Sequence, residues 1–135
     1  GRLTEALASF QSALQLHPQD EDALVGAARA TQKLGQLQDC LDYWRRAIAV
    51  NPEEPRFRGS YALLLEDAKR WDETRRQCRV WLDRQPNNIE ALSLWIRCLL
   101  QQGNKDEARR QFARLEALKP TNLDELRKRF EKELR

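Results

Sequence analysis

Apolar residues recur at steps of three and four positions along the whole chain. The series that follows Pro18 consists of Leu24, Ala27, Ala28, Thr31 and Leu34. This spacing places the apolar side chains on one face of an α-helix. A second series starts at Leu37 and stops at Asn51, because Pro52 disfavours helix at the residue before it. No segment shows sustained alternation with a period of two, so the pattern predicts helices and no strands.

A repeat organises these helices in pairs. Four of the five prolines are spaced 34 residues apart, namely Pro18, Pro52, Pro86 and Pro120. Acidic residues keep the same period, at Glu5, Asp39, Glu73 and Glu107. Such regularity is typical of repeat architectures. We predict a single domain with a half repeat at 1–20, full repeats at 21–54, 55–88 and 89–122, and a closing helix at 123–135. The chain starts with Gly1 and contains no methionine, so we interpret it as a fragment of a longer protein.

The turns and helix starts also follow the period. Gly35 and Gly103 share a position with Lys69. Glycine ends a helix in the left-handed conformation with little steric cost, whereas the same conformation at a lysine destabilises the backbone by about 1 kcal/mol. Lys69 therefore leaves the geometry of the middle repeat open. Two helix starts combine a polar residue with an acidic residue three positions later, which predicts Asn87 and Thr121 as N-caps.

The period, the two-helix unit and the residues at fixed positions resemble the tetratricopeptide repeat (TPR) family. Its pattern runs W-x2-L-G-x2-Y, then A-x3-F, then P. The third full repeat matches it with Leu92, Trp95, Ile96, Leu99, Ala108, Phe112, Leu115 and Pro120. One departure is Trp81, which stands where the family usually has alanine. The resemblance implies an all-α fold, a right-handed superhelical α-solenoid of antiparallel helix pairs.

The resemblance further implies that the first helix of each repeat lines a concave groove, which binds a peptide or helix of a partner protein. The candidate groove residues are the non-core positions of these helices: Val25, Arg29, Lys33, Arg56, Ser60, Leu63, Glu90, Ser93, Arg97 and Gln101. Arginines favour carboxylate or phosphate groups, and small residues such as Gly26 leave room for a ligand. The alternative is that the arginines are solvated or paired with Glu66 and Glu90.

One use of the family can be excluded. Repeats that hold the acidic tails of heat-shock chaperones need a two-carboxylate clamp of lysines, asparagines and an arginine. The matching positions here are Val25, Arg29, Ser60, Glu90 and Leu94. None carries the required residue, and Glu90 would repel an acidic tail. We therefore expect groove binding without this clamp.

A second hypothesis assigns the chain a structural role. The N-terminal half repeat lacks its inner helix, so we expect part of an apolar face to be uncovered. This face consists of Leu3, Leu7, Phe10 and Leu14. It would make the chain a scaffold or self-association element, with a homodimer of the fragment as the outcome.

Composition removes several other classes of function. The chain has 24 Lys+Arg against 21 Asp+Glu, giving an interspersed net charge of +3 that does not favour nucleic acid. No apolar stretch approaches the ~20 residues of a membrane span.

The residues that carry chemistry are few. Cys40, Cys78 and Cys98 form no CxxC, so we expect no metal site and a reducing, cytoplasmic compartment. His17 is the only histidine, and no phosphate-binding loop is present. We therefore expect no enzyme activity and no cofactor.

Overall fold

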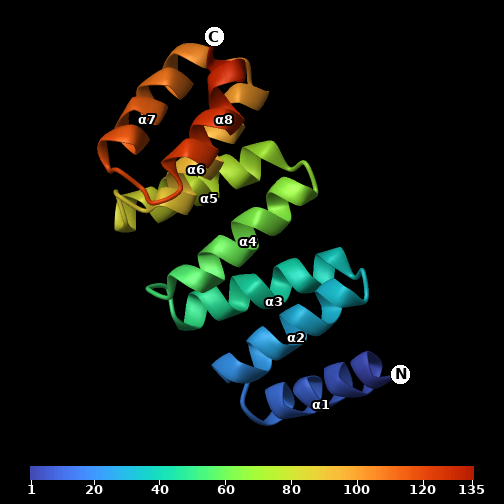
Figure 1. The fold of residues 1–135 in the computed structure, drawn as a ribbon. Helices are drawn as coiled ribbons and strands as arrows, with labels where there is room; N and C mark the ends of the chain where they lie inside the picture. Colours follow the sequence, from blue (N-terminus) through green and yellow to red (C-terminus); the bar gives the residue numbers. More distant parts are fainter. The chain divides into compact units, whose positions relative to one another are not determined.

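The computed structural model describes residues 1–135 and consists of helices joined by short turns (Figure 1). It has eight α-helices and no strand, so the predicted all-α class is confirmed. The helices are α1 (Arg2–Leu16), α2 (Glu21–Lys33), α3 (Leu37–Val50), α4 (Pro55–Asp67), α5 (Trp71–Arg84), α6 (Ile89–Gln101), α7 (Lys105–Ala117) and α8 (Leu123–Leu134). The chain divides into two compact units, Gly1–Leu64 and Leu65–Arg135. The division into one half repeat and three full repeats stays a prediction.

The first unit packs α2 between α1 and α3, with most of α4 completing it (Figure 1). Small residues let the helices approach closely, since Ala27 and Ala28 of α2 are fully buried. The Cys40 thiol of α3 donates a hydrogen bond to the Ala28 carbonyl at 3.2 Å. Between α3 and α4, Arg45 Nε donates to the Tyr61 hydroxyl at 2.8 Å. Buried apolar faces and a few polar contacts together hold this unit.

The second unit has its own core at α6, α7 and α8. The core cluster consists of Leu92, Ile96, Leu99, Ala108, Phe112, Leu115, Leu126, Phe130 and Leu134. The rings of Phe112 and Phe130 meet edge-on, with centroids 5.9 Å apart. The closing helix α8 thus buries one face against the helix pair before it. This burial removes apolar surface from water, which is the main force that holds such units together.

The turns between paired helices repeat the same backbone geometry. Gly35, Lys69 and Gly103 all have positive φ, at 75°, 58° and 73°. Lys69 therefore adopts the same left-handed conformation as the two glycines. Each turn is closed by a backbone hydrogen bond of 2.9 Å in the same register: Gln36 N to Thr31 O, Arg70 N to Leu65 O, and Asn104 N to Leu99 O. This is the bond that ends helices in the Schellman motif. Lys119 also has a positive φ, of 51°, which the sequence pattern did not indicate.

The predicted N-caps are each wrong by one position. Asn88, not Asn87, caps α6 and accepts from the Ala91 N–H at 2.9 Å. At α8 the N-cap residue is Asn122, with no side-chain bond, and not Thr121. Both helices begin one residue later than the spacing of polar and acidic residues suggested. The cap position itself follows the repeat, because Asp20 caps α2 in the same way, at 3.0 Å from the Ala23 nitrogen.

The helices are also too short or too polar to cross a bilayer: no one of the eight combines the required length and hydropathy.

Candidate functional site

A pocket of about 280 Å³ in the first unit is lined by residues of α2, α3 and α4. Its lining consists of Glu21, Asp22, Val25, Gly26, Arg29, Trp44, Arg56, Phe57 and Ser60. Four of the predicted groove residues are among them: Val25, Arg29, Arg56 and Ser60. The repeat explains their convergence, since equivalent positions of successive inner helices face the same side. The structure therefore brings part of the predicted groove into one concave site.

The floor of this pocket is aromatic. Trp44 of α3 and Phe57 of α4 are 3% and 4% exposed, and their ring centroids lie 6.0 Å apart. Sequence reasoning did not assign either residue to the site. Phe57 had a signal, because the equivalent positions in the neighbouring repeats hold the alanines Ala23 and Ala91. The large ring in that position gives the pocket an apolar base.

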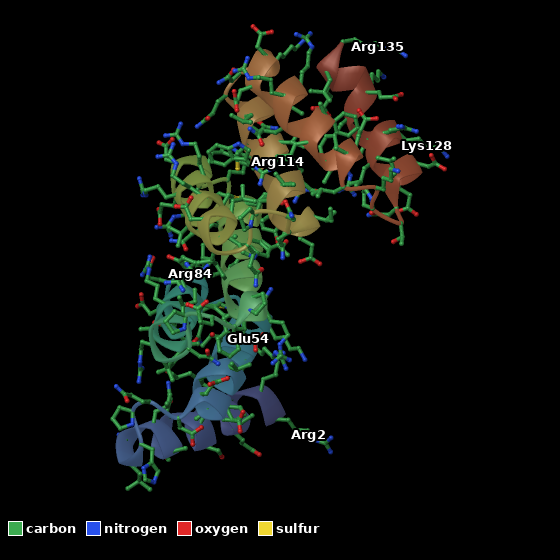
Figure 2. All side chains as sticks on the ribbon, turned by 90° about the vertical axis from the view of Figure 1, so that its left-hand side faces the viewer. Arg2, Glu54, Arg84, Arg114, Lys128 and Arg135 are labelled. Atoms are coloured by element: carbon green, nitrogen blue, oxygen red, sulfur yellow. The ribbon has the colours of Figure 1, made fainter.

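Charged side chains surround the start of α2 at one end of the pocket. Arg56 Nε contacts Glu54 Oε1 at 2.8 Å, and Figure 2 labels Glu54 just before α4. The hydrogen bonds from Arg56 hold the pKa of the Glu54 carboxyl below its usual range. Glu21 accepts a hydrogen bond from Asn51 Nδ2 at 3.4 Å. Asp22 stands beside Glu21 at the rim. This end of the pocket is acidic, with one guanidinium already engaged.

The other end of the pocket is basic. Arg29 lies two turns after Asp22 on α2, is exposed at the pocket and forms no ion pair within the protein. Lys33 follows one turn later in the last turn of α2 and is also exposed. Arg29 is therefore the basic lining residue that is exposed to a ligand, whereas Arg56 is already paired with Glu54.

The other predicted groove residues lie outside this pocket. Leu63 is exposed on α4. In the second unit, Glu90 and Gln101 are exposed on α6, whereas Ser93 is buried. Arg97 is held by Glu66 through two contacts, Nε to Oε2 at 2.5 Å and Nη2 to Oε1 at 3.1 Å. Both side chains are mostly buried, with exposures of 25% and 16%. For Arg97, the pairing with Glu66 that the sequence left open is what the structure shows.

The predicted self-association face is largely covered within the first unit. Leu7 and Leu14 are buried because α2 packs against α1. Phe10 is half-buried, and its ring occupies the space where Gly26 has no side chain. Leu3 is the most open of the four, at 36%. Self-association through this face stays a prediction.

Comparison with known proteins identifies the family. The model of the tetratricopeptide repeat family matches residues 1–64 and 65–128. The chain therefore belongs to the TPR family, as the resemblance indicated, and is a protein–protein interaction module of that class.

Two relatives are proteins of Komagataeibacter xylinus. Cellulose synthase 1 operon protein C is 28% identical over 172 aligned residues, which cover 93% of this chain and 13% of that protein. Cellulose synthase operon protein C is 42% identical over 53 residues, 39% of this chain and 4% of that protein. The chain thus spans only a small part of the curated relatives that it matches.

Solved structures show the same fold at low identity. MamA superposes with a TM-score of 0.77 and 19% identity, covering 88% of this chain and 70% of MamA. YrrB, described as a TPR protein with an unusual peptide-binding site, has a TM-score of 0.72 and 21% identity, with 96% and 70% covered. A tetratricopeptide repeat protein from Parabacteroides merdae has a TM-score of 0.72 and 23% identity, with 94% and 52% covered. These likenesses confirm the predicted TPR-type solenoid fold.

Proposed function

We propose that this chain binds a peptide or helix of a partner protein through the pocket between α2 and α4. The observation that carries the proposal is the aromatic floor of Trp44 and Phe57 beneath a charged rim. Aromatic residues dominate the energetics of protein interfaces, where a buried anchor fills a pocket and polar groups surround it. The carboxylate clamp for chaperone tails forms no part of this proposal, because its residues are absent at the matching positions.

The size of the pocket indicates what enters it. Pockets that hold whole small molecules measure roughly 300–1,000 Å³, and this one holds about 280 Å³. It is suited to one large side chain of a partner segment, while the rest of that segment lies along the groove. A site that holds one anchoring side chain supports a dissociation constant of roughly micromolar order. The favourable contacts of that side chain must offset the conformational entropy that the peptide loses on binding.

A library selection tests this proposal. Random peptides are selected on the immobilised wild-type chain, and the affinities of the selected peptides are measured by fluorescence anisotropy. Ser60→Phe should fill the pocket and weaken them at least tenfold, whereas Arg79→Glu, an exposed change on α5, should leave them unchanged. Circular dichroism confirms that each variant is folded. Failure to select any peptide, or equal affinity for Ser60→Phe and wild type, would contradict the proposal.

We also propose that the chain acts by binding and not by catalysis. His17, the only histidine, is exposed in the turn between α1 and α2. None of the residues that line the pocket is a histidine, the side chain that most often transfers protons in acid–base catalysis. Turnover of a selected peptide, seen as new masses after prolonged incubation, would contradict this part of the proposal.

The cytoplasm is the compartment that we propose. All three cysteines are free and buried, which suits a reducing environment. A disulfide found in the protein isolated with its thiols alkylated in the cell would contradict this assignment.

A further inference from the structure

The side of α2 that faces the pocket carries an ordered series of charges. Glu21 and Asp22 in the first turn, Val25 and Gly26 in the middle and Arg29 after them all line the pocket. Lys33 lies outside the lining, one turn beyond Arg29 in the last turn of α2. At 1.5 Å per helical residue, Asp22 and Arg29 are about 10 Å apart along the axis and Lys33 is about 6 Å further on. The apolar floor lies between these two charged ends.

Arg56 does not cancel the acidic end. Its guanidinium is bound to Glu54 at 2.8 Å, and it also interacts with Glu21. Glu21 and Asp22 line this end of the pocket with Arg56, whose guanidinium is already bound to Glu54, so negative charge is in excess among the lining residues here. A cation on a ligand would gain from this imbalance, while an anion would gain from Arg29 at the other end.

From this order we propose that the pocket selects a dipolar segment of its partner: one large apolar residue with a basic residue on one side and an acidic residue on the other. This inference rests on the proposed peptide-binding function and adds the class of ligand. The apolar side chain occupies the floor of Trp44 and Phe57. The basic residue lies toward Asp22 and the acidic residue toward Arg29.

The geometry also sets the spacing of such a segment. In an extended chain, side chains on one face recur every second residue, about 6.7 Å apart. The pattern basic-x-apolar-x-acidic therefore separates its two charges by about 13 Å. Measured from Asp22, that distance falls between Arg29 and Lys33, and both of their flexible side chains can reach it. If the charged residues were adjacent to the apolar residue, both would lie on the face of the strand opposite to it.

A competing explanation is that these charges stabilise α2 alone. Acidic residues at the start of a helix and basic residues at its end interact favourably with the helix dipole. That explanation predicts a change in helix stability when the charges are altered. It predicts no change in the preference for one ligand over another, so ligand preference is the property to measure.

Three labelled peptides separate these explanations. Each has phenylalanine in the centre of a Gly/Ser-flanked core: Lys-Ala-Phe-Ala-Glu, Lys-Ala-Phe-Ala-Lys or Glu-Ala-Phe-Ala-Glu. With the wild-type chain at low salt, the dipolar peptide should bind about three- to fivefold more tightly than either uniformly charged peptide. This size is expected because exposed ion pairs are weak. The preference should disappear at high salt, and a dipolar peptide with alanine for phenylalanine should not bind.

Reversing the charge of single pocket residues provides the decisive test. Arg29→Glu should transfer the preference to the peptide with two lysines, and Asp22→Lys should transfer it to the peptide with two glutamates. Arg79→Glu, far along the chain on α5, serves as the control and should preserve the wild-type order. Thermal unfolding of each variant reports any effect on α2 itself.

The outcomes distinguish this inference from the proposed function. Equal affinity for the three peptides, or an order that Arg29→Glu does not change, would overturn the dipolar preference while leaving peptide binding intact. If none of the three binds but library peptides still depend on Ser60, the inference alone fails. If the library peptides do not depend on Ser60 either, the proposed function fails with it.

Discussion

Gly26 of α2 leaves space for a side chain of the neighbouring helix α1. A glycine within a helix destabilises it by about 1 kcal/mol relative to alanine, and Gly26 lies in the middle of α2. A Cβ atom built at this position would overlap the ring of Phe10 from α1. The absence of a side chain thus admits the aromatic ring of the preceding helix. The small residue expected to leave room for a ligand is used partly for packing within the unit.

Replacing this glycine should reveal the contact. In the wild-type background, Gly26→Ala should lower the free energy of unfolding, because overpacking costs about 1–3 kcal/mol and exceeds the gain in helix propensity. In a Phe10→Ala background, the same change should raise it by up to about 1 kcal/mol. Urea unfolding of the four proteins measures both effects. Equal effects in the two backgrounds would show that Phe10 does not set the size of residue 26.

Cys40 gives the first unit a dependence on alkaline pH. Burial raises the pKa of its thiol, partly offset by the nearby Thr31 hydroxyl and Trp44 indole. The folded state therefore retains this proton at a pH where the unfolded chain releases it. The resulting stabilisation is complete below the unfolded pKa of about 8.5 and is lost as the pH rises through the higher folded value.

Cys40→Ser tests this dependence, because serine keeps a donor for the Ala28 carbonyl but does not titrate in this range. Between about pH 8 and pH 10, the free energy of unfolding should fall more steeply for wild type than for the variant. Urea unfolding at several pH values gives the two slopes. Parallel slopes would mean that the thiol is not the titrating group.

At the scale of the elements, the helices are tied to the turns by contacts that recur with the repeat. Arg46 of α3 donates to the Pro18 carbonyl at 3.2 Å. In the second unit, Arg114 of α7, labelled in Figure 2, donates in the same way to the Pro86 carbonyl. The two pairs are equivalent positions of different repeats. Two of the prolines that revealed the period therefore also supply acceptors that fix each turn to the second helix after it.

The start of α6 depends on Asn88 in particular. Asn88→Ala should lower the free energy of unfolding of the second unit by about 1 kcal/mol, because the Ala91 N–H loses its cap. Asn87→Ala is the matched control, since Asn87 is the adjacent exposed asparagine in the turn and should have little effect. Chemical denaturation followed by tryptophan fluorescence measures both. A larger effect at Asn87 would place the cap where the sequence spacing had put it.

The pattern of the sequence predicted the elements because their signals are local. Helix faces and the turn glycines depend on residues a few positions apart, and the structure confirms them. The N-caps were displaced by one residue because two adjacent polar residues suit the role in each turn, Asn87 and Asn88 before α6 and Thr121 and Asn122 before α8. The pairing of Arg97 with Glu66 stayed open because it joins long, flexible side chains of different helices, whose positions depend on packing.

The same reasoning separates the predicted and unpredicted parts of the candidate site. Val25, Arg29, Arg56 and Ser60 were found because they occupy equivalent faces of successive helices. Trp44 and Phe57 were not assigned to the pocket because their positions belong to the core in the repeat pattern. A large ring at a position that is alanine in other repeats was the available signal.

At the scale of the whole molecule, stability is divided between cores that are made from consecutive helices. In repeat proteins, stability is close to a sum of local terms, and opening occurs in contiguous segments. The cluster at α6, α7 and α8 contains Phe130, which is almost fully buried. The core around Trp44 and Ala27 is built from other helices.

Phe130→Ala should therefore have a local effect. The loss of its ring should cost about 3–5 kcal/mol, and amide hydrogen exchange should lose protection mainly in residues 89–134. Residues 21–50 should keep most of theirs. Mass spectrometry of peptic fragments measures this distribution, with Phe130→Leu as a milder comparison. A uniform loss of protection along the chain would indicate one cooperative unit.

The confinement of the pocket lining to residues 21–60 has a consequence for engineering and for evolution. Because these forty or so consecutive positions hold both the floor and the rim, a short exchange of gene sequence can carry the complete recognition surface into another array. Duplication of that stretch would copy the specificity together with its scaffold. New partners can then arise by recombination, without change elsewhere in the chain.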